Sequence, residues 1–410
     1  MSDHGRKPQS AQPAQPGALA GVRVVDFTHI ISGPLATQTL ADLGADVVKI
    51  EDAREGDVAR LLAPHKNGIS HHFAQFNRNK RSIALDLKSA EGKRAALELI
   101  RNGDILMENF SPGVIDRLGF GFEACRKINE RLIYCSISGF GQSGPWAHKR
   151  SLDLVAQAYS GVMSTNGTAD GPPLKVGIPI GDTSASLFAT IAVVSALYER
   201  QATGVGKYID IGMFDSLLAS LANLGGYYHA TGTQPARVGS GHYITTPYGA
   251  FEAADGEVIV AVYTNAAWAG LCVALDMPEL AADERFATGP ARAENRPLVH
   301  AIIGPRLKRM KSAPLLELLD RNGVPCAPIN SIAQAFENPH TAERGMQLEL
   351  VHPIYGEVSV TSAPLRDVMK ASHTAPPMHG EHTAEILRHL GWDETEIRRV
   401  VPSASTPQRD

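Results

Sequence analysis

An aspartate at the start of a long apolar helix pattern is the residue best suited to chemistry in this sequence. Asp182 follows a short extended apolar stretch, residues 174–180, and opens the string D-T-S-A-S-L-F-A-T-I-A-V-V-S-A-L. A carboxylate in this position is common as an N-cap that accepts the free amide hydrogens of the first helical turn. The same turn would expose a carboxylate beside the flexible backbone of Gly181, where it could attack an electrophilic carbon. The local sequence leaves both interpretations open.

A second group of residues could bind a long anionic ligand. Basic side chains are expected at strand ends or at the starts of the helices that follow, where anions bind best; they are Arg78, Lys80, Arg81 and Arg117. Asn109 and Phe110 lie between them in the sequence and add an amide and an aromatic ring. Cations suit phosphates, the ring suits a flat heterocycle, and the polar groups suit amides. The set predicts an adenine nucleotide with a pantetheine-like arm, although basic residues at loop tips are usually only solvated.

Other cofactor and nucleophile sites are disfavoured. Glu51 ends the second predicted strand, as a ribose-binding acid would, but the first turn is H-I-I-S-G-P-L-A-T and lacks the three glycines of a dinucleotide site. The group H-G-E-H at 379–382 has no metal-ligand spacing, so no metal is expected. No G-x-S-x-G elbow is present around residues 136–145, where the glycines predict a flexible loop that closes over a ligand.

The elements that must position these residues alternate between strands and helices. A strand at 22–27, a helix that begins at Gly33-Pro34 and ends at Gly44, and a strand at 47–50 form a βαβ unit. Strands at 82–85, 104–107 and 132–137 and helices at 90–101 and 122–129 continue the pattern. The sequence therefore predicts an α/β fold with a doubly wound, Rossmann-like large domain, whose ligands lie outside the carboxyl ends of the strands.

The second half of the chain predicts a different architecture. Helices are expected at 182–200 and 215–229, then a hairpin that turns at Asp255-Gly256 and charged helices to about Arg321. Strand-like segments return in V-P-C-A-P-I and G-E-V-S-V, and a helix from Glu381 ends the fold. We expect a disordered tail at 1–18, a large domain at 19–225, a small α+β domain at 226–325, and a segment at 326–410 that returns to the large domain.

Composition limits the possible partners. The 410 residues are 43% hydrophobic and 20% charged, with a net charge of −4, so no basic field is available to attract nucleic acid or an anionic membrane. The four cysteines are widely spaced, which favours a reducing compartment and no disulfide framework. No signal peptide is expected in the Pro-, Gln- and Ser-rich start, and no apolar run reaches the ~20 residues of a membrane span. The prediction is a cytoplasmic protein.

Taken in order, the motifs resemble those of class III CoA-transferases, the formyl-CoA-transferase-like enzymes. The strings are L-A-G-V-R-V-V-D-F-T, L-A-D-L-G-A-D-V-V-K-I-E, N-R-N-K-R-S-I, E-N-F-S-P-G, S-G-F-G-Q-S-G-P, G-D-T-S-A-S, P-Y-G-A-F-E-A-A-D-G and G-E-H-T. They extend from about Leu19 to about Leu390. The resemblance implies an interlocked homodimer and a catalytic aspartate at Asp182 that exchanges CoA through mixed anhydrides and an aspartyl-CoA thioester. A CoA thioester would be the substrate, and no permanently bound cofactor is expected.

The resemblance also implies which residues form the site. The CoA-binding residues would be His29, Ile30, Ile31, Ser32, Arg54, Asn77, Asn79, Lys80, Asn109, Phe110, Arg117, Ser138 and Gly139. Backbone amides at 139–141 could stabilise the oxyanion. An aspartate with an ordinary pKa near ~3.9 would be ionised without a general base. Formyl-CoA transferases have Gln-Ala where this chain has Ile31-Ser32, and a CoA-contacting arginine where Asp52 stands, with Arg54 as its substitute. These departures favour succinyl-CoA and small dicarboxylates over oxalate.

Two other functions remain open. The related 2-methylacyl-CoA racemases use a histidine immediately before an aspartate that matches Asp153, and here that position is Leu152. The racemase interpretation therefore lacks its base. In a non-catalytic CoA-binding protein, Asp182 would be a helix cap only. Deuterium incorporation at the α-carbon of a bound acyl group would indicate the racemase, and CoA binding without any transfer would indicate the binding protein.

Overall fold

The structure is a computed structural model that describes residues 16–400, and their contacts divide them into two units. Unit 1 comprises the described residues up to Ser160, Ile178–Ser220, and the described residues from His340 onward. Unit 2 comprises Gly161–Gly177 and Leu221–Pro339. The chain therefore passes between the units several times, and each unit is built from segments that are distant in sequence.

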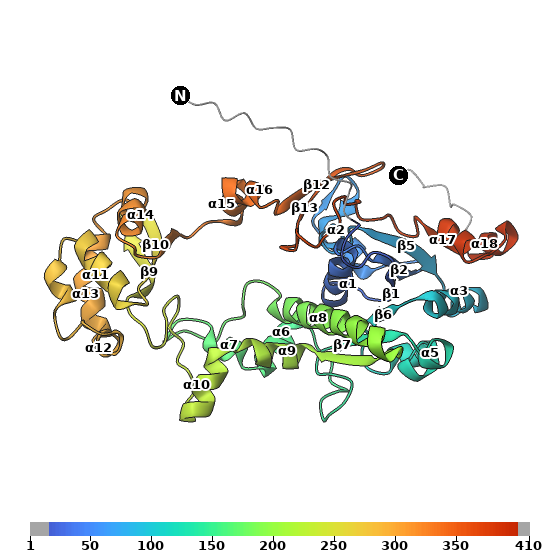
Figure 1. Ribbon diagram of the computed structural model, residues 1–410, viewed down its shortest axis with the longest axis horizontal. Helices are drawn as coiled ribbons and strands as arrows, with labels where there is room; N and C mark the ends of the chain where they lie inside the picture. Colours follow the sequence, from blue (N-terminus) through green and yellow to red (C-terminus); the bar gives the residue numbers. More distant parts are fainter. Residues whose placement is uncertain (1–15, 401–410) are drawn as a thin grey trace. The chain divides into compact units, whose positions relative to one another are not determined.

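Unit 1 is organised around a six-stranded parallel sheet (Figure 1). The strand order is β5-β2-β1-β6-β7-β8, which is the doubly wound order in which the first three strands run outward in one direction and the next three in the other. The strands are β1 (Arg23–Asp26), β2 (Asp46–Asp52), β5 (Lys80–Leu85), β6 (Ile105–Glu108), β7 (Ile133–Ser138) and β8 (Tyr208–Gly212). The order reverses between β1 and β6, so a ligand site is expected at their carboxyl ends.

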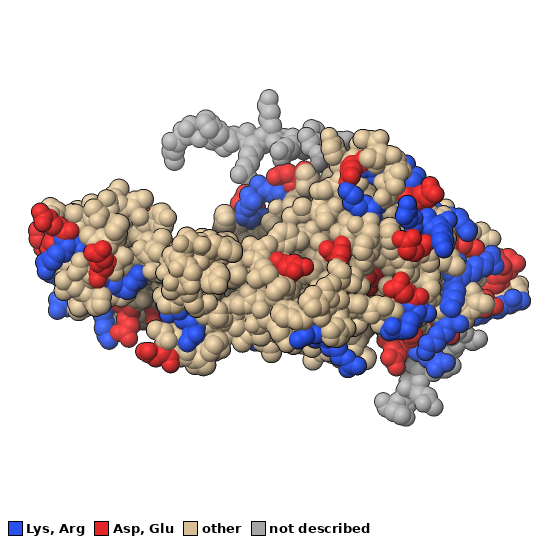
Figure 2. Space-filling model, turned by 90° about the horizontal axis from the view of Figure 1, so that it is seen from below, with Lys and Arg blue, Asp and Glu red and all other residues tan. Residues whose placement is uncertain are grey.

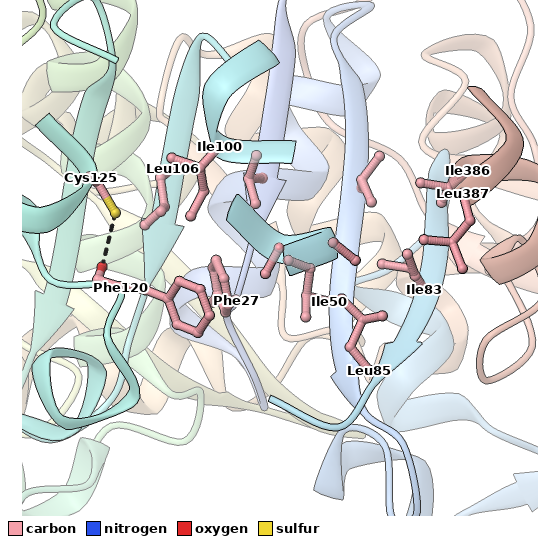
Figure 3. Close-up of a cluster of buried hydrophobic side chains, with 14 of the residues drawn as sticks. Phe27, Ile50, Ile83, Leu85, Ile100, Leu106, Phe120, Cys125, Ile386 and Leu387 are labelled. Carbon is pink, nitrogen blue, oxygen red and sulfur yellow. Dashed lines mark hydrogen bonds between the residues drawn. The ribbon is translucent and has the colours of Figure 1, made fainter. Parts of the chain in front are cut away.

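Helices cover both faces of this sheet. On one face, α1 (Ser32–Asp42) packs against α8 (Ile180–Thr203), and both contact the strands. The other face carries α3 (Ala90–Asn102), α5 (Phe122–Ile128), α17 (Thr383–His389) and α18 (Glu394–Val400). Figure 3 shows the apolar core on this second face, where Ile386 and Leu387 of α17 lie beside Ile83 of β5. Because both faces are covered, the strands are apolar almost throughout, with Val24, Val25 and Leu106 at most 2% exposed.

Shorter elements complete unit 1. The two-stranded sheets are β3 (His65–Lys66) with β4 (Ile69–Ser70), and β12 (Gln347–His352) with β13 (Gly356–Thr361). The remaining helices are η1 (Val58–Leu61), α2 (His71–Gln75), α4 (Val114–Leu118), α6 (Asp153–Tyr159) and α9 (Met213–Ser220). In addition, α16 (Pro339–Glu343) begins at the last residue of unit 2.

Unit 2 has its own antiparallel sheet and core. The strands, in the order β11-β10-β9, are β9 (Tyr248–Ala253), β10 (Gly256–Ala261) and β11 (Cys326–Pro328). The helices are α7 (Val162–Thr165), α10 (Asn223–Thr231), α11 (Asn265–Ala274), η2 (Pro278–Ala281), α12 (Gly289–Glu294), α13 (Arg296–Leu307), α14 (Ser312–Arg321) and α15 (Ile332–Glu337). Trp268 and Phe286 lie in the core beneath the sheet. The predicted hairpin at Asp255-Gly256 is confirmed by the pairing of Ala253 with Gly256.

Several sequence predictions differ from the structure. The edge strand β8 and the final helix α18 were not predicted, and the helix expected at 215–229 is two helices, α9 and α10, separated at Leu221–Ala222. Residues 161–177 and 326–339 belong to unit 2, in the second case because β11 pairs with β10. Residues 1–15 of the expected tail lie outside the described residues, but Ala18 is ordered and donates its N–H to the Val368 carbonyl at 3.1 Å.

Helix α8 is long and apolar enough to cross a membrane, contrary to the expectation that no segment would be. Half of its most apolar window is buried inside the protein, as in the core helix of a folded domain. Its buried residues, including Ala185, Ala189 and Val193, are almost completely inaccessible. The apolar pattern of α8 is therefore accounted for in part by packing against α1 and the sheet.

Two ion pairs close together in sequence differ in burial and should differ in their contribution to stability. Arg78 binds both carboxylate oxygens of Asp42, at 3.0 and 2.5 Å, and both side chains are 1% exposed. Arg81 binds Asp46 at 2.7 Å with side chains 29% and 46% exposed. We expect Arg78→Ala to lower the free energy of unfolding by about 3–5 kcal/mol, because it leaves a buried carboxylate unpaired. The matched Arg81→Ala should cost less than about 1 kcal/mol in urea denaturation, and equal losses would contradict this account.

Candidate active site

The amino terminus of α8 is capped by a residue from another helix. The helix begins at Ile180, and Pro179 at the N-cap position offers no side-chain hydrogen bond. Instead, Oδ1 of Asp153 accepts the Gly181 N–H at 2.7 Å and the Asp182 N–H at a longer 3.4 Å. Asp153 thus supplies the acceptor that the first turn of a helix needs. The interpretation of Asp182 as the N-cap is wrong, since Asp182 is the third residue of the helix and its carboxylate is not required for capping.

Glycine at position 181 allows this approach. A Cβ atom on Gly181 would lie 2.9 Å from Oδ1 of Asp153, which is closer than side chains tolerate. Asp153 is the first residue of α6, and its other oxygen accepts the Gln157 side-chain amide at 2.7 Å. The carboxylate is therefore held on both sides while it caps α8.

Asp182 is partly buried and lies close to the start of α1. Burial and the nearby charge of Asp153 raise its pKa to about 6, while a hydrogen bond with Ser32 acts in the opposite direction. The expectation of an ordinary aspartate is therefore wrong. A carboxylate with this pKa is still mostly ionised at neutral pH, yet it is more basic than a solvated aspartate. An ionised carboxylate of raised basicity is able to act as a nucleophile or as a base.

The loop before α1 has a strained backbone. Ile30 has a φ of +69°, which is rare for a β-branched residue. Asn109 holds the preceding residue on both sides: its Oδ1 accepts the His29 N–H and its Nδ2 donates to the His29 carbonyl, each at 2.9 Å. The Ile30 N–H in turn donates to Asp57 at 3.2 Å. Strain of this kind persists only where surrounding contacts impose it, and it is frequent at functional sites.

A cleft of about 580 Å³ lies at the carboxyl ends of β1 and β2 and continues past the end of β5. Its lining includes His29, Asp52, Arg54, Lys88 and Phe110. The His29 and Phe110 rings lie 5.1 Å apart between centroids. The volume is within the range of pockets for small ligands and cofactors.

Two acidic residues of the cleft floor, Asp57 and Glu51, are paired with cations of the protein. Lys49 contacts Asp57 at 2.9 Å, and Arg60 contacts Glu51 at 2.7 Å. Burial alone would raise the pKa of Asp57, but the charge of Lys49 and hydrogen bonds from backbone N–H groups outweigh it and lower the pKa to about 2. Arg54 and Lys88 are further basic residues on the cleft lining. Because Asp52, Glu55 and Asp86 also line the cleft, an anionic ligand would meet Arg54 and Lys88 beside acidic groups.

The predicted site residues do not all lie in one place. The residues around the start of α1 lie together near Asp182 and the cleft, namely His29, Ile30, Ile31, Ser32, Asn109 and Phe110. Arg54 lines the cleft from the turn after β2. Asn77, Asn79 and Lys80 lie in the interior and do not line it. Arg117 is exposed on α4, next to the lining residue Leu118.

The interior group has a structural environment of its own. The ammonium group of Lys80 lies 3.1 Å from Asp26 and 2.8 Å from Oδ1 of Asn77. The Asn79 amide donates to Asp42 at 2.7 Å. Burial lowers the pKa of Lys80 to about 8 despite the charge of Asp26. These contacts satisfy the polar side chains inside the protein, so their effect on a ligand would be indirect.

Ser138 and Gly139 lie at the end of β7, where the flexible loop was expected. Gly139 packs so tightly that a Cβ atom would lie 2.1 Å from the Cβ of Ser151. Phe140 packs against Trp146 and Phe214, with centroid distances of 5.7 and 6.0 Å. Aromatic contacts therefore hold Phe140 of this segment against Trp146 and against Phe214 of α9.

Sequence reasoning missed two acidic residues of this region. Asp153 was considered only as a racemase residue, and no local signal reports its contact with a helix 28 positions away. Glu108 ends β6, and its Oε2 accepts the Phe110 N–H at 2.9 Å, while Oε1 has no hydrogen-bond partner among the described residues. Burial raises the pKa of Glu108 to about 7. Its place at a strand end, directly before Asn109, was the available signal. Within residues 16–400, no group of three His, Cys, Asp or Glu side chains could hold a metal ion.

Comparison with known proteins identifies the family. A model of CoA-transferase family III matches residues 19–383. The chain is 36% identical to the succinyl-CoA:glutarate CoA-transferase of Mus musculus, over 96% of this chain and 91% of the relative. It is 42% identical to the acetyl-CoA:oxalate CoA-transferase of Acetobacter aceti, over 82% and 87%. A CAIB/BAIF family protein of Brucella suis has a similar crystal structure, with a TM-score of 0.82 and 37% identity over 92% of this chain and all of that one.

The chain therefore belongs to CoA-transferase family III, and it is a CoA-transferase. The resemblance inferred from the motifs is confirmed, as is the α/β class with a large parallel sheet. Its relatives transfer CoA to carboxylic acids that include dicarboxylates.

The contact between Asp153 and α8 predicts a pH effect. Asp153→Asn keeps the Oδ1 acceptor for the Gly181 N–H but removes the negative charge near Asp182. The charged form of Asp182 becomes easier to form, so its pKa should fall and the acidic limb of the kcat/KM profile should move to lower pH. The measurement is kcat/KM between pH 4.5 and 8, with the exposed Asp320→Asn as control. An acidic limb that stays in place would show that Asp153 does not influence the titrating group.

Proposed function

We propose that the protein transfers CoA from an acyl-CoA such as succinyl-CoA to a small dicarboxylate, with Asp182 as the nucleophile. The observation that carries the proposal is the state of the Asp182 carboxylate. It is partly buried, has a pKa raised to about 6, and is left free for chemistry because Asp153 caps α8. A covalent route through this carboxylate divides one difficult acyl exchange into easier steps.

The proposed reaction balances as two equivalent exchanges. A carboxylate oxygen of Asp182 attacks the thioester carbonyl, the C–S bond breaks, and a mixed anhydride and CoA thiolate form. The thiolate then attacks the Asp182 carbonyl of the anhydride and releases the donor acid, leaving an aspartyl-CoA thioester. The acceptor carboxylate attacks this thioester and expels the thiolate again. Attack of the thiolate on the acceptor's own carbonyl finally gives the new acyl-CoA and regenerates Asp182.

The cleft supports the binding of CoA. The rings of His29 and Phe110 offer a surface for stacking, and Arg54 and Lys88 offer charges for phosphates. The cleft reaches His29, whose backbone is held by Asn109. Three residues later, the Ser32 carbonyl lies against the same Ser186 hydroxyl as the Asp182 carbonyl. A CoA thioester along this path would bring its acyl end toward the proposed nucleophile.

The choice of donor and acceptor is supported by the relatives. Succinyl-CoA:glutarate and succinyl-CoA:mesaconate CoA-transferases are both similar to this chain over more than nine-tenths of its length. Oxalate CoA-transferases are also among the similar proteins. Ile31 and Ser32, which depart from the formyl-CoA transferase pattern, support an acceptor larger than oxalate.

A racemase mechanism has less support from this site. Leu152, where the related racemases have a histidine, has no proton to exchange, and it is 69% exposed.

The exposed apolar surface of α8 supports a contact with a second copy of the chain. Leu187, Ile191 and Tyr198 are 58%, 61% and 78% exposed on this helix. Figure 2 shows a face of the molecule on which uncharged areas separate the charged side chains. We therefore propose that the protein is a homodimer. We also propose a cytoplasmic location, because the four free cysteines suit a reducing compartment.

The nucleophile assignment predicts the effect of Asp182→Asn. This variant keeps the size of the side chain but cannot form the anhydride, so transfer from succinyl-CoA to glutarate should fall by at least about 10³-fold. The Kd for CoA, measured by isothermal titration calorimetry, should change less than about threefold. The wild-type enzyme with succinyl-CoA and hydroxylamine should yield an adduct at Asp182 by peptide mass spectrometry, and Asp182→Asn should yield none. Normal turnover by the variant would rule out Asp182 as the nucleophile. If the wild-type protein binds CoA but transfers it to no acid, the protein is a CoA-binding protein and not an enzyme.

A further inference from the structure

We propose that Glu51 is a positioning residue for the CoA site, which holds the loop of residues 28–32 in place through Asp57. Glu51 lies near the end of β2, where a dinucleotide-binding fold would have its ribose-binding acid. Because the cleft beside this loop is taken as the place where CoA binds, the inference rests on the proposed function. Glu51 is not expected to touch CoA or the reacting atoms.

The carboxylate of Glu51 is fully used within the protein. Its Oε1 accepts the Ser82 hydroxyl at 2.5 Å and Nη2 of Arg60 at 2.7 Å. Its Oε2 accepts the Asp57 N–H at 2.9 Å and Nε of Arg60 at 2.7 Å. An ionised carboxylate offers about four acceptor positions, and these contacts occupy all of them. Although Glu51 lines the cleft, it therefore has no acceptor left for a ribose hydroxyl.

Asp57 carries the effect of Glu51 to the loop. Its backbone N–H is held by Glu51, and its side-chain Oδ1 accepts the Ile30 N–H at 3.2 Å. The same oxygen accepts the Ala59 N–H at 2.9 Å, which fixes the carboxylate at the start of η1. Ile30 has a φ of +69°, which a β-branched residue adopts only where surrounding contacts impose it. The position of the Asp57 backbone is thus one of the contacts that hold the loop in this conformation.

Buried charges fix the position of both acids. Glu51 and Asp57 are each 4% exposed. Burial would raise the pKa of Glu51, but the hydrogen bonds and the charge of Arg60 outweigh it, so the pKa is lowered. Lys49, which is also buried, contacts Asp57 at 2.9 Å and donates to the Thr28 carbonyl at 2.5 Å. The loop is therefore tied at Thr28 as well, to the same group of charges.

The H-G-E-H segment at 379–382 anchors Glu51 from the C-terminal part of the chain. The Gly380 N–H donates to Oγ of Ser82 at 2.9 Å, and the Ser82 hydroxyl in turn donates to Glu51. Gly380 has a φ of +65°, and a Cβ atom there would lie 2.9 Å from the side chain of Ala84, so the close approach requires glycine. A continuous series of hydrogen bonds thus joins this segment to the loop at the cleft.

Two variants at position 51 test this role. Glu51→Leu fills a similar volume but accepts no hydrogen bond. Its Ile30 N–H should therefore exchange with deuterium at least about fivefold faster, measured by mass spectrometry with electron-transfer fragmentation. Its Kd for CoA, measured by isothermal titration calorimetry, should rise about three- to tenfold. Glu51→Gln still offers a carbonyl oxygen to the Asp57 N–H and should return both values to within about twofold of the wild type.

Tyr134→Phe provides the matched control for a loss of stability alone. Tyr134 is 1% exposed, and its hydroxyl donates to the Phe120 carbonyl at 2.9 Å, outside this series of hydrogen bonds. This variant should lower the midpoint of thermal unfolding but leave the Ile30 exchange rate and the Kd for CoA unchanged. If Glu51→Leu does not fold, Ser82→Ala removes one contact of Glu51 and should change both values in the same direction by at least about twofold.

An Ile30 exchange rate that stays at the wild-type value in the folded variant would overturn the inference. So would faster exchange with an unchanged Kd for CoA, since the loop would then have no part in binding. Faster exchange and weaker CoA binding in a protein whose wild type transfers no CoA would instead contradict the proposed function and leave the role of Glu51 standing.

Discussion

The hydrogen bond from the Gly181 amide to the Asp153 carboxylate is the interaction on which the site depends. It satisfies the first turn of α8 from outside the helix and so leaves the Asp182 carboxylate without a capping role. It also places a second negative charge near Asp182, which together with burial raises its pKa to about 6. The same contact therefore anchors the first turn of α8 and raises the pKa of Asp182.

Buried ion pairs provide the rigid surroundings. Lys80 pairs with Asp26 at the end of β1, Lys49 pairs with Asp57 in the cleft floor, and Arg78 pairs with Asp42 at the end of α1. Removing either partner of such a pair leaves an isolated charge in the interior, so these contacts impose one arrangement on the loops that they join. One of the anchored loops carries Ile30 in its strained conformation, because Asp57 also accepts the Ile30 N–H.

The sequence predicted the elements whose signals are local. The first βαβ unit and the hairpin at Asp255-Gly256 have strong periodicity or turn residues, and both are present. It missed β8, a five-residue edge strand, and α18, which lies beyond the helix from Glu381 that was expected to end the fold. It also assigned Asn77, Asn79 and Lys80 to the CoA site, whereas here each has a buried partner inside the protein.

By itself, the sequence indicated the α/β class and the family and singled out Asp182 as the candidate for catalysis, because these follow from periodicity and from motifs read in order. Only the tertiary structure decided what surrounds that aspartate. Asp153 comes from another helix, Ser32 from the start of α1 and Asn109 from the end of β6, and no pattern along the chain reports their proximity. Burial and a neighbouring charge act through space, so the pKa and the freedom of the Asp182 carboxylate are properties of the fold.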